Sequence, residues 1–407
     1  MKFLFVHQNC PGQFKHLAPY LAAARGNEVV FITRPGKPDL AGVRKIEYQP
    51  ARQPADSTHD YLRLTEEGVL NGQAVARVAM RLRKEGFEPE VIFAHMGWGE
   101  ALYLKQVWAD AKLVGYFEWY YHARGSDVGF LERQPPAVDT ACRLQTRNCL
   151  HLMNLELADW GISPTRWQWQ QHPAVYRQRI SVIHDGLDTD RIKPDPKASG
   201  SVKQGLRLRA GDEVVTYVAR NLEPYRGFPT FMRAAEIILK RRPATQIVVL
   251  GEDGVSYGQR PEGGRCYREQ LLQEVDLDPA RIHFLGRIDY QRFLRVLQLS
   301  AVHIYLTVPF VLSWSMLEAM AAGCLVIGSR TPPVEEVIRH GRNGLLVDFF
   351  SASEVADAVD RVLDHPDRMA ALRRAARETI LQNYALESCL QKQVQLAEQL
   401  VSGALPL

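Results

Sequence analysis

Two arginines in the second half of the chain could together bind a diphosphate. Arg220 lies just after a predicted strand over 213–218, and Arg226 stands at the start of a predicted helix over 227–241. Guanidinium groups form charge-assisted, bidentate hydrogen bonds with phosphate oxygens, each worth about 1.5 to 3 kcal/mol. A single arginine is more typical of the solvated surface. The placement of both residues, at a strand end and at the adjoining helix start, favours a shared anion site.

The turn between a predicted strand ending near Thr307 and a predicted helix beginning near Ser315 could also hold an anion. Unpaired backbone N–H groups and the helix dipole favour phosphate at such a corner. Ser315 and Glu318 equally fit a capping box, in which both side chains only satisfy backbone donors. The residue types alone leave both interpretations open.

Polar and aromatic residues follow three predicted strands in the first half of the chain. Gly12 lies in a strand-to-helix turn that lacks the G-x-G-x-x-G pattern, so this turn does not by itself indicate a dinucleotide. His95 ends a second strand beside two glycines, where a ligand-binding and a structural histidine are equally probable. Aromatic faces with hydroxyl groups after the third strand suit a sugar or another amphipathic acceptor, or form a buried cluster. The candidate acceptor-side residues are Glu118, Tyr120, Tyr121, His122 and Arg124.

The elements that must position these residues alternate between strand and helix. Short apolar runs predict strands at 2–6, 28–33, 90–94, 112–116 and 160–163, and then at 213–218, 246–250, 281–285, 301–305 and 324–327. Amphipathic stretches predict helices at 66–84, 99–108 and 227–241, and the tail over 351–401 is helical in pattern. The segment 206–209 is too basic for a core. Pro, Gly, Ser and charged residues concentrate at 183–201, as at a domain boundary. The fold class is therefore α/β, with two doubly wound domains and a ligand-binding crevice between them.

Composition excludes several classes of protein. The chain has 407 residues, of which 46% are hydrophobic and 24% charged, as in globular proteins and unlike disordered or fibrous ones. A formal net charge of +4 is too small to indicate nucleic-acid binding. The 6 cysteines lack C-x-x-C spacing and predict neither a disulfide framework nor a zinc site. The apolar start is too short for a signal peptide and no run is long enough to span a membrane, so the cytoplasm is the expected location.

Several segments, taken together, resemble the retaining nucleotide-sugar glycosyltransferases of family 4. The similarity in order and spacing lies at 182–188, 218–228, 247–254, 282–288, 317–323 and 343–347. The resemblance implies the GT-B architecture of two Rossmann-like domains with an interdomain cleft. The implied domains are an acceptor-side domain over 1–190, a nucleotide-sugar domain over 191–384, and a C-terminal helix over 385–407 that crosses back to the first domain.

The resemblance also implies roles for individual residues. Arg220 and Arg226 would hold the donor diphosphate and, with His95 near the sugar, form the catalytic group. The ribose hydroxyls would bind Glu318. The other donor-binding positions are Gly12 beside the phosphates, the backbone of Arg287 and Ile288 at the base, and Ser313, Trp314 and Ser315.

One position departs from the family pattern. Phe310 stands where the family has a glutamate that contacts the donor sugar, so that role is not transferred, and Ser313 or nearby backbone N–H groups would substitute.

The expected function is retaining transfer of a sugar from a UDP- or GDP-linked donor to a hydroxyl of a glycan, lipid or protein. The resemblance implies no metal and no cofactor, with the nucleotide sugar as co-substrate. Peripheral contact with the inner membrane surface is compatible with the slightly basic charge. Two alternatives stay open: a non-catalytic carbohydrate- or partner-binding protein, favoured by Phe310, and a sugar-nucleotide epimerase of the same architecture.

Overall fold

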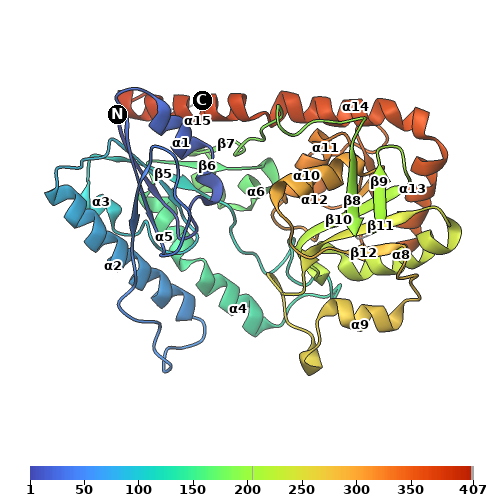
Figure 1. The fold of residues 1–407 in the computed structure, drawn as a ribbon. Coiled ribbons are helices and arrows are strands. Elements are labelled where there is room, and N and C mark those ends of the chain that lie inside the picture. Colours follow the sequence, from blue (N-terminus) through green and yellow to red (C-terminus); the bar gives the residue numbers. More distant parts are fainter. Residues whose placement is uncertain (204, 405–407) are drawn as a thin grey trace. The chain divides into compact units, whose positions relative to one another are not determined.

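The computed structural model describes residues 1–203 and 205–404, which group into two units (Figure 1). Unit 1 contains Met1–Gly129, Gln134–Gly186 and the residues from Leu386 onward, and unit 2 contains Phe130–Arg133 and Leu187–Ala385. The change of unit thus comes between Gly186 and Leu187, before the boundary at 190 that the sequence predicts. Residues 405–407, at the end of the predicted C-terminal segment, lie outside the described residues.

Unit 1 is built on a parallel sheet with the strand order β3-β2-β1-β4-β5-β6-β7. Its strands are β1 (Lys2–Val6), β2 (Glu28–Thr33), β3 (Arg44–Glu47), β4 (Val91–His95), β5 (Lys112–Tyr116), β6 (Trp160–Ser163) and β7 (Ile180–Val182). Its helices are α1 (Leu17–Ala23), α2 (Arg63–Lys84), α3 (Leu104–Val107), α4 (Val138–Arg147), α5 (Cys149–Leu157), α6 (Arg166–Gln171), α7 (Ala174–Arg177) and α15 (Leu386–Ser402), with a 3₁₀ turn at Gly12–Phe14.

Alternating residues of β1 enter two separate cores. Leu4 and Val6 join a core that includes apolar residues of α2, whereas Phe3 and Phe5 join a core that includes residues of α1 and α15. Successive strand residues point to opposite faces of a sheet. Helices therefore cover both faces of the unit 1 sheet, which is the condition under which a parallel sheet is stable.

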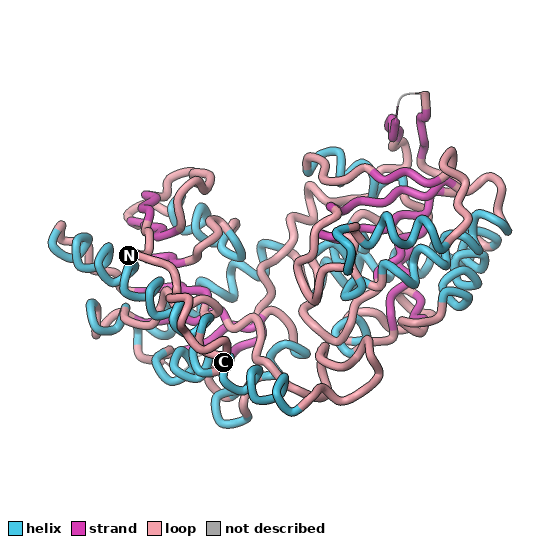
Figure 2. Tube along the Cα trace, turned by 90° about the horizontal axis from the view of Figure 1, so that it is seen from below, coloured by secondary structure: helices cyan, strands magenta, loops and turns pink. Residues whose placement is uncertain are grey.

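Unit 2 contains a second parallel sheet, with the strand order β12-β11-β10-β13-β14-β15, and a small antiparallel pair, β8-β9. The strands are β8 (Ser199–Lys203), β9 (Leu206–Arg209), β10 (Val214–Asn221), β11 (Gln246–Glu252), β12 (Ile282–Phe284), β13 (Val302–Tyr305), β14 (Leu325–Ser329) and β15 (Leu345–Val347). The helices are α8 (Phe228–Arg241), α9 (Tyr267–Glu274), α10 (Tyr290–Leu299), α11 (Trp314–Ala321), α12 (Pro332–Glu335), α13 (Ala352–Asp364) and α14 (Pro366–Asn383), with 3₁₀ turns at Pro224–Arg226 and Glu262–Gly264. The four residues from Val214 to Tyr217 are all buried, so this sheet too is covered on both faces, and Figure 2 shows its strands between helices.

The two large sheets share one topology. In each sheet, the three strands that come first along the chain lie in succession from the centre to one edge. The next strand pairs with the first of them at the centre, and the later strands continue to the other edge. The reversal falls between β1 and β4 in unit 1 and between β10 and β13 in unit 2. In open α/β sheets, ligands bind beyond the carboxyl ends of the strands at such a switch point.

The structure adds short elements to those predicted from sequence. The strands that were not predicted from sequence have three to five residues each: β3, β7, β8, β9 and β15. Residues 206–209 form β9, where Leu208 is buried in a core while Arg207 and Arg209 are exposed. The predicted helix over 99–108 shrinks to α3. Among the described residues, no helix is both long and apolar enough to cross a membrane.

Candidate functional site

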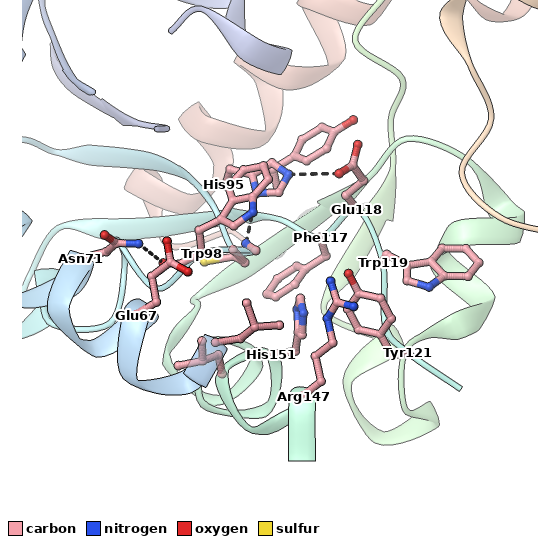
Figure 3. A pocket seen from close by; sticks show the side chains of 16 residues that line it. Glu67, Asn71, His95, Trp98, Phe117, Glu118, Trp119, Tyr121, Arg147 and His151 are labelled. Carbon is pink, nitrogen blue, oxygen red and sulfur yellow. Dashed lines mark hydrogen bonds and ion pairs between the residues drawn. The ribbon is translucent and has the colours of Figure 1, made fainter. Parts of the chain in front are cut away.

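In unit 1, a pocket of about 120 Å³ lies at the carboxyl ends of β4 and β5, beside the switch point. Figure 3 shows the side chains that line it. Its polar lining comes from the ends of β4 and β5 and from α2, α4 and α5, and includes Glu67, Asn71, His95, Glu118, Arg147 and His151. Its aromatic lining includes Trp98, Trp119 and Tyr121. The pocket therefore combines carboxylates, hydrogen-bond donors and ring faces in one small volume.

The tautomer of His95 is fixed by the backbone. The Gly97 N–H donates to His95 Nδ1 at 3.1 Å, so the ring proton is on Nε2. The His95 side chain is 3% exposed, and its Nε2 lies 3.4 Å from Glu118 Oε2 without hydrogen-bond geometry. Gly97 is needed here, since a Cβ at this position would lie 2.9 Å from the imidazole. His95 thus presents an N–H donor to the pocket.

Glu118 is held from its other side by a chain of hydrogen bonds. The Asn9 N–H donates to His7 Nδ1 at 2.8 Å, and burial lowers the pKa of His7 to about 3, so the neutral ring carries its proton on Nε2. His7 Nε2–H then donates to Gln13 Oε1 at 2.8 Å, and Gln13 Nε2–H donates to Glu118 Oε1 at 3.1 Å. The tautomer of His7 fixes the direction of each hydrogen bond in this relay. The last hydrogen bond therefore has Glu118 Oε1 as its acceptor.

Aromatic rings surround these two side chains. The Trp98 ring lies against the His95 imidazole (Figure 3). The two rings are stacked, with centroids 4.2 Å apart and planes 21° apart. The guanidinium carbon of Arg147 lies 3.8 Å from the ring centroid of Tyr121. Ring faces of this kind pack against the C–H faces of sugars.

A buried acid lies behind the pocket wall. Glu100 is 1% exposed, and its Oε1 accepts a hydrogen bond from the Tyr48 hydroxyl at 2.8 Å. Tyr48 in turn accepts from Arg34 Nε, and Arg34 NH2 donates to Asn71, which donates to the Trp98 carbonyl. Glu100 Oε2 has no hydrogen-bond partner among the described residues, and burial raises the pKa of this carboxyl. Glu100 is therefore stabilised as the protonated acid.

Glu100→Gln is expected to stabilise the protein at pH 8 but not at pH 4. A raised folded pKa means that the unfolded chain ionises first, so the wild type loses stability as the pH rises above about 4, the value for an exposed glutamate. The amide does not titrate and keeps an oxygen for Tyr48. We expect a gain on the order of 1 kcal/mol, or about 2 °C in Tm, at pH 8. Thermal unfolding of variant and wild type across this pH range, with the exposed Glu88→Gln as control, checks the sign; a stability difference between variant and wild type that is the same at both pH values would contradict it.

The structure brings some of the predicted acceptor-side residues together and not others. Glu118 and Tyr121 line the pocket together with Trp119, which was not predicted as a site residue. Tyr120 instead packs on a core, and His122 Nε2 bonds to the Gln171 carbonyl at 2.7 Å. Neither these two residues nor the exposed Arg124 line the pocket.

Gly12 lies beside the relay. It has a φ of +50°, and a Cβ there would lie 2.5 Å from the His7 ring, so glycine is required for His7 to occupy its position. His7 and Gln13 themselves were not predicted as site residues. The signal that could have found His7 is its position as a polar residue directly after β1. The backbone N–H of Asn9, two residues later, can then donate to its ring.

The switch point of unit 2 holds Arg226. Its NH1 group donates to Thr307 Oγ1 at 2.8 Å, to the Val311 carbonyl at 3.2 Å and to the Tyr305 hydroxyl at 3.3 Å. All three acceptors are neutral, and no carboxylate of the described residues forms an ion pair with Arg226. By contrast, Arg242 pairs with three carboxylates. A partly buried cation favours a counter-charge, so Arg226 is suited to an anionic ligand.

Three aromatic rings lie beside Arg226. Tyr257 lies 5.5 Å from its guanidinium carbon, and the Phe310 ring is 5.0 Å from that of Tyr257 and 6.1 Å from that of Tyr225. The buried Glu223 carboxylate accepts from the backbone N–H of Tyr257 at 2.9 Å and so fixes the loop that carries this ring. Phe310 is 7% exposed. An aromatic cluster therefore occupies the place at which the family pattern has a carboxylate.

The helix that follows, α11, begins differently from the predicted capping box. Ser313 is the N-cap residue, and its Oγ accepts from the Ser315 N–H at 3.3 Å. The capping-box interpretation of Ser315 and Glu318 is therefore wrong. Glu318 Oε1 instead accepts a hydrogen bond of 2.7 Å from the Tyr290 hydroxyl, at the first turn of α10. The Glu318 carboxylate thus bonds to α10, the helix that follows the carboxyl end of β12.

The remaining predicted donor-binding residues have fewer contacts that fix their side chains than Arg226 and Glu318 have. Arg220 and Arg287 are exposed, and neither guanidinium has a hydrogen bond or ion pair within the described ranges. Ile288 packs on a core, and Trp314 is half-buried at the first turn of α11. The structure therefore joins Arg226 to the loop before α11, but it does not join Arg220 to either. No group of three or more His, Cys, Asp or Glu side chains in the described part of the chain could hold a metal ion.

Comparison with known protein families gives two adjoining matches. The model described as "Glycosyl transferase family 4 group" matches residues 25–192, and the model described as "Glycosyl transferases group 1" matches residues 201–379. The two matches cover the site residues from His95 to Glu318.

Curated relatives are similar over part of their length. A D-inositol 3-phosphate glycosyltransferase of Rhodococcus jostii is 29% identical over 212 residues, which is 51% of this chain and 45% of the relative. A GDP-mannose-dependent alpha-(1-6)-phosphatidylinositol monomannoside mannosyltransferase of Mycobacterium tuberculosis is 28% identical over 217 residues, covering 49% of this chain and 51% of the relative. The matches thus span about half the length of these relatives.

Solved structures are similar over nearly the whole chain. Sucrose-phosphate synthase from Thermosynechococcus elongatus has a TM-score of 0.75 at 22% identity, covering 99% of this chain and 100% of that one. Anabaena Alr3699/HepE in complex with UDP-glucose has a TM-score of 0.67 at 19% identity, also covering 99% and 100%. At these identities, the likeness establishes the GT-B fold of two parallel-sheet domains.

Proposed function

Because this chain belongs to the family 4 glycosyltransferases, we propose that it transfers a sugar from a nucleotide-diphosphate donor to a hydroxyl group of an acceptor. The observation that carries the proposal is the Arg226 guanidinium at the switch point of unit 2, whose hydrogen-bond acceptors among the described residues are all neutral. Diphosphate oxygens would supply the counter-charge. Glu318 lies on the same edge of the sheet with a carboxylate that can accept hydrogen bonds from ribose hydroxyls.

The proposed reaction retains the anomeric configuration and uses no metal. The bond between the anomeric carbon and the diphosphate oxygen breaks, and the acceptor oxygen forms a bond to the same face of that carbon. The acceptor proton passes to a diphosphate oxygen. Arg226 and the N–H groups at the start of α11 would stabilise the negative charge that develops on the leaving diphosphate, which is the largest contribution expected of such a site.

The names of similar proteins support a choice of substrates to test. HepE has been crystallised with UDP-glucose, and the mycobacterial relative is named as GDP-mannose-dependent. The names of the Rhodococcus and Mycobacterium relatives both contain an inositol group. We therefore propose UDP- or GDP-sugars as donors, and as acceptor a hydroxyl of a glycan, lipid or protein that binds in the unit 1 pocket.

Calorimetry with UDP-glucose and GDP-mannose, with and without EDTA, is the direct test. We expect one of them to bind with a Kd between about 1 μM and 1 mM, the range typical of enzyme substrates, and EDTA to leave this value unchanged. Nuclear magnetic resonance of the transfer product should show the anomer of the donor.

Each other outcome has a defined meaning. Failure to bind any nucleotide sugar would overturn the proposal, and loss of binding in EDTA would overturn the metal-free reaction. Conversion of the donor without an acceptor would identify an epimerase. Binding without turnover, across a panel of acceptors, would identify a non-catalytic protein.

A further inference from the structure

We propose that the unit 1 pocket binds one neutral, hydroxylated ring, a sugar or a cyclitol, through a hydroxyl that accepts from His95 Nε2–H and donates to Glu118. The inference rests on the proposed function, because it names the chemical class of the acceptor. It goes further in assigning the two hydrogen bonds and in giving Gln13 a positioning role.

The donor half of the site is His95. Its Nδ1 is occupied by the Gly97 N–H, so Nε2 carries the proton in any charge state of the ring. Nε2 is buried and has no hydrogen-bond partner among the described residues, although Glu118 Oε2 is 3.4 Å away. A buried donor left without a partner costs about 1 to 3 kcal/mol. A ligand oxygen beside Nε2 would recover that free energy.

The acceptor half of the site is Glu118, and its role is set from outside the pocket. The relay from Asn9 through His7 orients Gln13 so that its NH2 group points to Glu118 Oε1. This hydrogen bond favours the ionised carboxylate. Glu118 Oε2, on the side of His95, is therefore an acceptor atom of a charged group.

A hydroxyl group matches this pair better than other common groups. It can accept from His95 Nε2–H and donate to Glu118 at once, because it has one proton and two lone pairs. A carboxylate or phosphate can only accept, and Glu118 repels it. An ammonium group can only donate and leaves the His95 proton without a partner.

The rest of the pocket suits a single ring. Trp98 stacks behind His95, and Trp119 and Tyr121 line the pocket beside Glu118. These faces favour the C–H surface of a sugar or cyclitol. A volume of about 120 Å³ is well below that of pockets for drug-sized ligands and suits one ring.

A matched pair of probes tests the assignment: methyl β-D-glucopyranoside and methyl β-D-glucuronide, which differ only in the exocyclic group. Binding to the full chain is measured by saturation-transfer nuclear magnetic resonance. The wild type should bind the neutral glucoside at least about tenfold more tightly than the uronide, and should also bind myo-inositol. Equal affinity for the two glycosides would overturn the proposal.

Glu118→Gln should change this selectivity because of the relay. The new amide must turn its oxygen toward Gln13 and its NH2 group toward His95, which places two donors in the pocket. We expect the glucoside to bind about tenfold more weakly and the preference over the uronide to disappear. Gln13 does not line the pocket. Gln13→Leu should weaken binding of the glucoside severalfold, because it removes the hydrogen bond that holds Glu118 in place. Wild-type affinity for the glucoside in both variants would contradict the proposal.

Two measurements separate this inference from the proposed function. Glu156→Gln, an exposed carboxylate of α5, is the matched control and should bind both probes as the wild type does. Calorimetry with UDP and GDP on the same samples reports on unit 2. Nucleotide binding without the expected probe selectivity would refute the acceptor assignment alone, whereas probe selectivity without nucleotide binding would refute the proposed function.

Discussion

Arg226→Gln is expected to weaken binding of the nucleotide-sugar donor about 100-fold and to lower kcat by a further 100-fold or more. Among the described residues, no carboxylate forms an ion pair with the Arg226 guanidinium, so it can serve as the counter-charge of the diphosphate, and its loss removes that charge. A hydrogen bond between charged groups is worth about 1.5 to 3 kcal/mol, and each 1.4 kcal/mol is a factor of ten. Removal of a group that stabilises developing charge typically costs 100-fold to 1000-fold in kcat. Calorimetry and initial rates measure the two effects.

Glutamine is shorter than arginine and does not reach the oxygens that bind Arg226 NH1, so the thermal stability of the variant is measured beside its affinity. Arg233→Gln is the matched control, since Arg233 is an exposed residue of α8 that pairs with Glu274 at 2.9 Å. The control should bind the donor as the wild type does. Undiminished donor affinity in Arg226→Gln, in a protein with the thermal stability of the control, would show that Arg226 only supports the loop before α11.

Much of the fold follows from apolar periodicity. The residues of α8 that recur every three or four positions are all buried, including Phe228, Phe231, Ala235 and Ile238. The long buried strands were predicted within a few residues because runs of Val, Ile, Leu and Phe are needed when both faces of a strand are covered. The missed strands are edge strands and a hairpin of three to five residues each, and a run of that length is too brief to show a pattern.

The site was less predictable, because its geometry depends on hydrogen bonds between distant segments. Spacing placed His95 and Glu118 at strand ends, and both line the pocket. Nothing local indicates that Gln13 bonds to Glu118, 105 positions away. The local pattern around Ser315 and Glu318 was misleading, since the nearer Ser313 caps the helix and Tyr290 takes the carboxylate. Contacts of this kind follow from sheet topology and side-chain packing.

The sites in the two units share one origin in topology. In unit 1, His7 follows β1 and His95 is the last residue of β4. In unit 2, Arg226 comes after β10 and Thr307 after β13. Each pair flanks the strands between which the order reverses, where the loops diverge and leave room for a ligand. The chemistry differs because the loops differ. Unit 1 offers a directed donor and acceptor, suited to a hydroxyl, and unit 2 offers a cation, suited to a phosphate.

Glu318→Ala is expected to weaken binding of the nucleoside diphosphate about 30-fold to 100-fold, through the ribose alone. Glu318 Oε1 accepts from the Tyr290 hydroxyl, and a carboxylate is an acceptor with several lone pairs, to which ribose hydroxyls can donate. Two hydrogen bonds to a charged acceptor account for an effect of this size. The 2′,3′-dideoxy analogue of the same nucleotide should bind wild type and variant with nearly equal affinity, since it lacks the groups that Glu318 would hold. Calorimetry with both proteins and both nucleotides gives the coupling free energy between Glu318 and the ribose hydroxyls.

Tyr290→Phe separates a ribose contact from a structural role of Glu318. It removes the hydroxyl that donates to Oε1 at 2.7 Å but keeps the ring, over which the guanidinium carbon of Arg191 lies at 4.9 Å. If Glu318 binds ribose, this variant should bind the nucleotide as tightly as the wild type or more tightly, because an acceptor position is released. If Glu318 serves only to anchor Tyr290, both substitutions should weaken the nucleotide and its dideoxy analogue by the same factor. A coupling near zero between Glu318 and the ribose hydroxyls would therefore remove this residue from the donor site and leave Arg226 as its anchor.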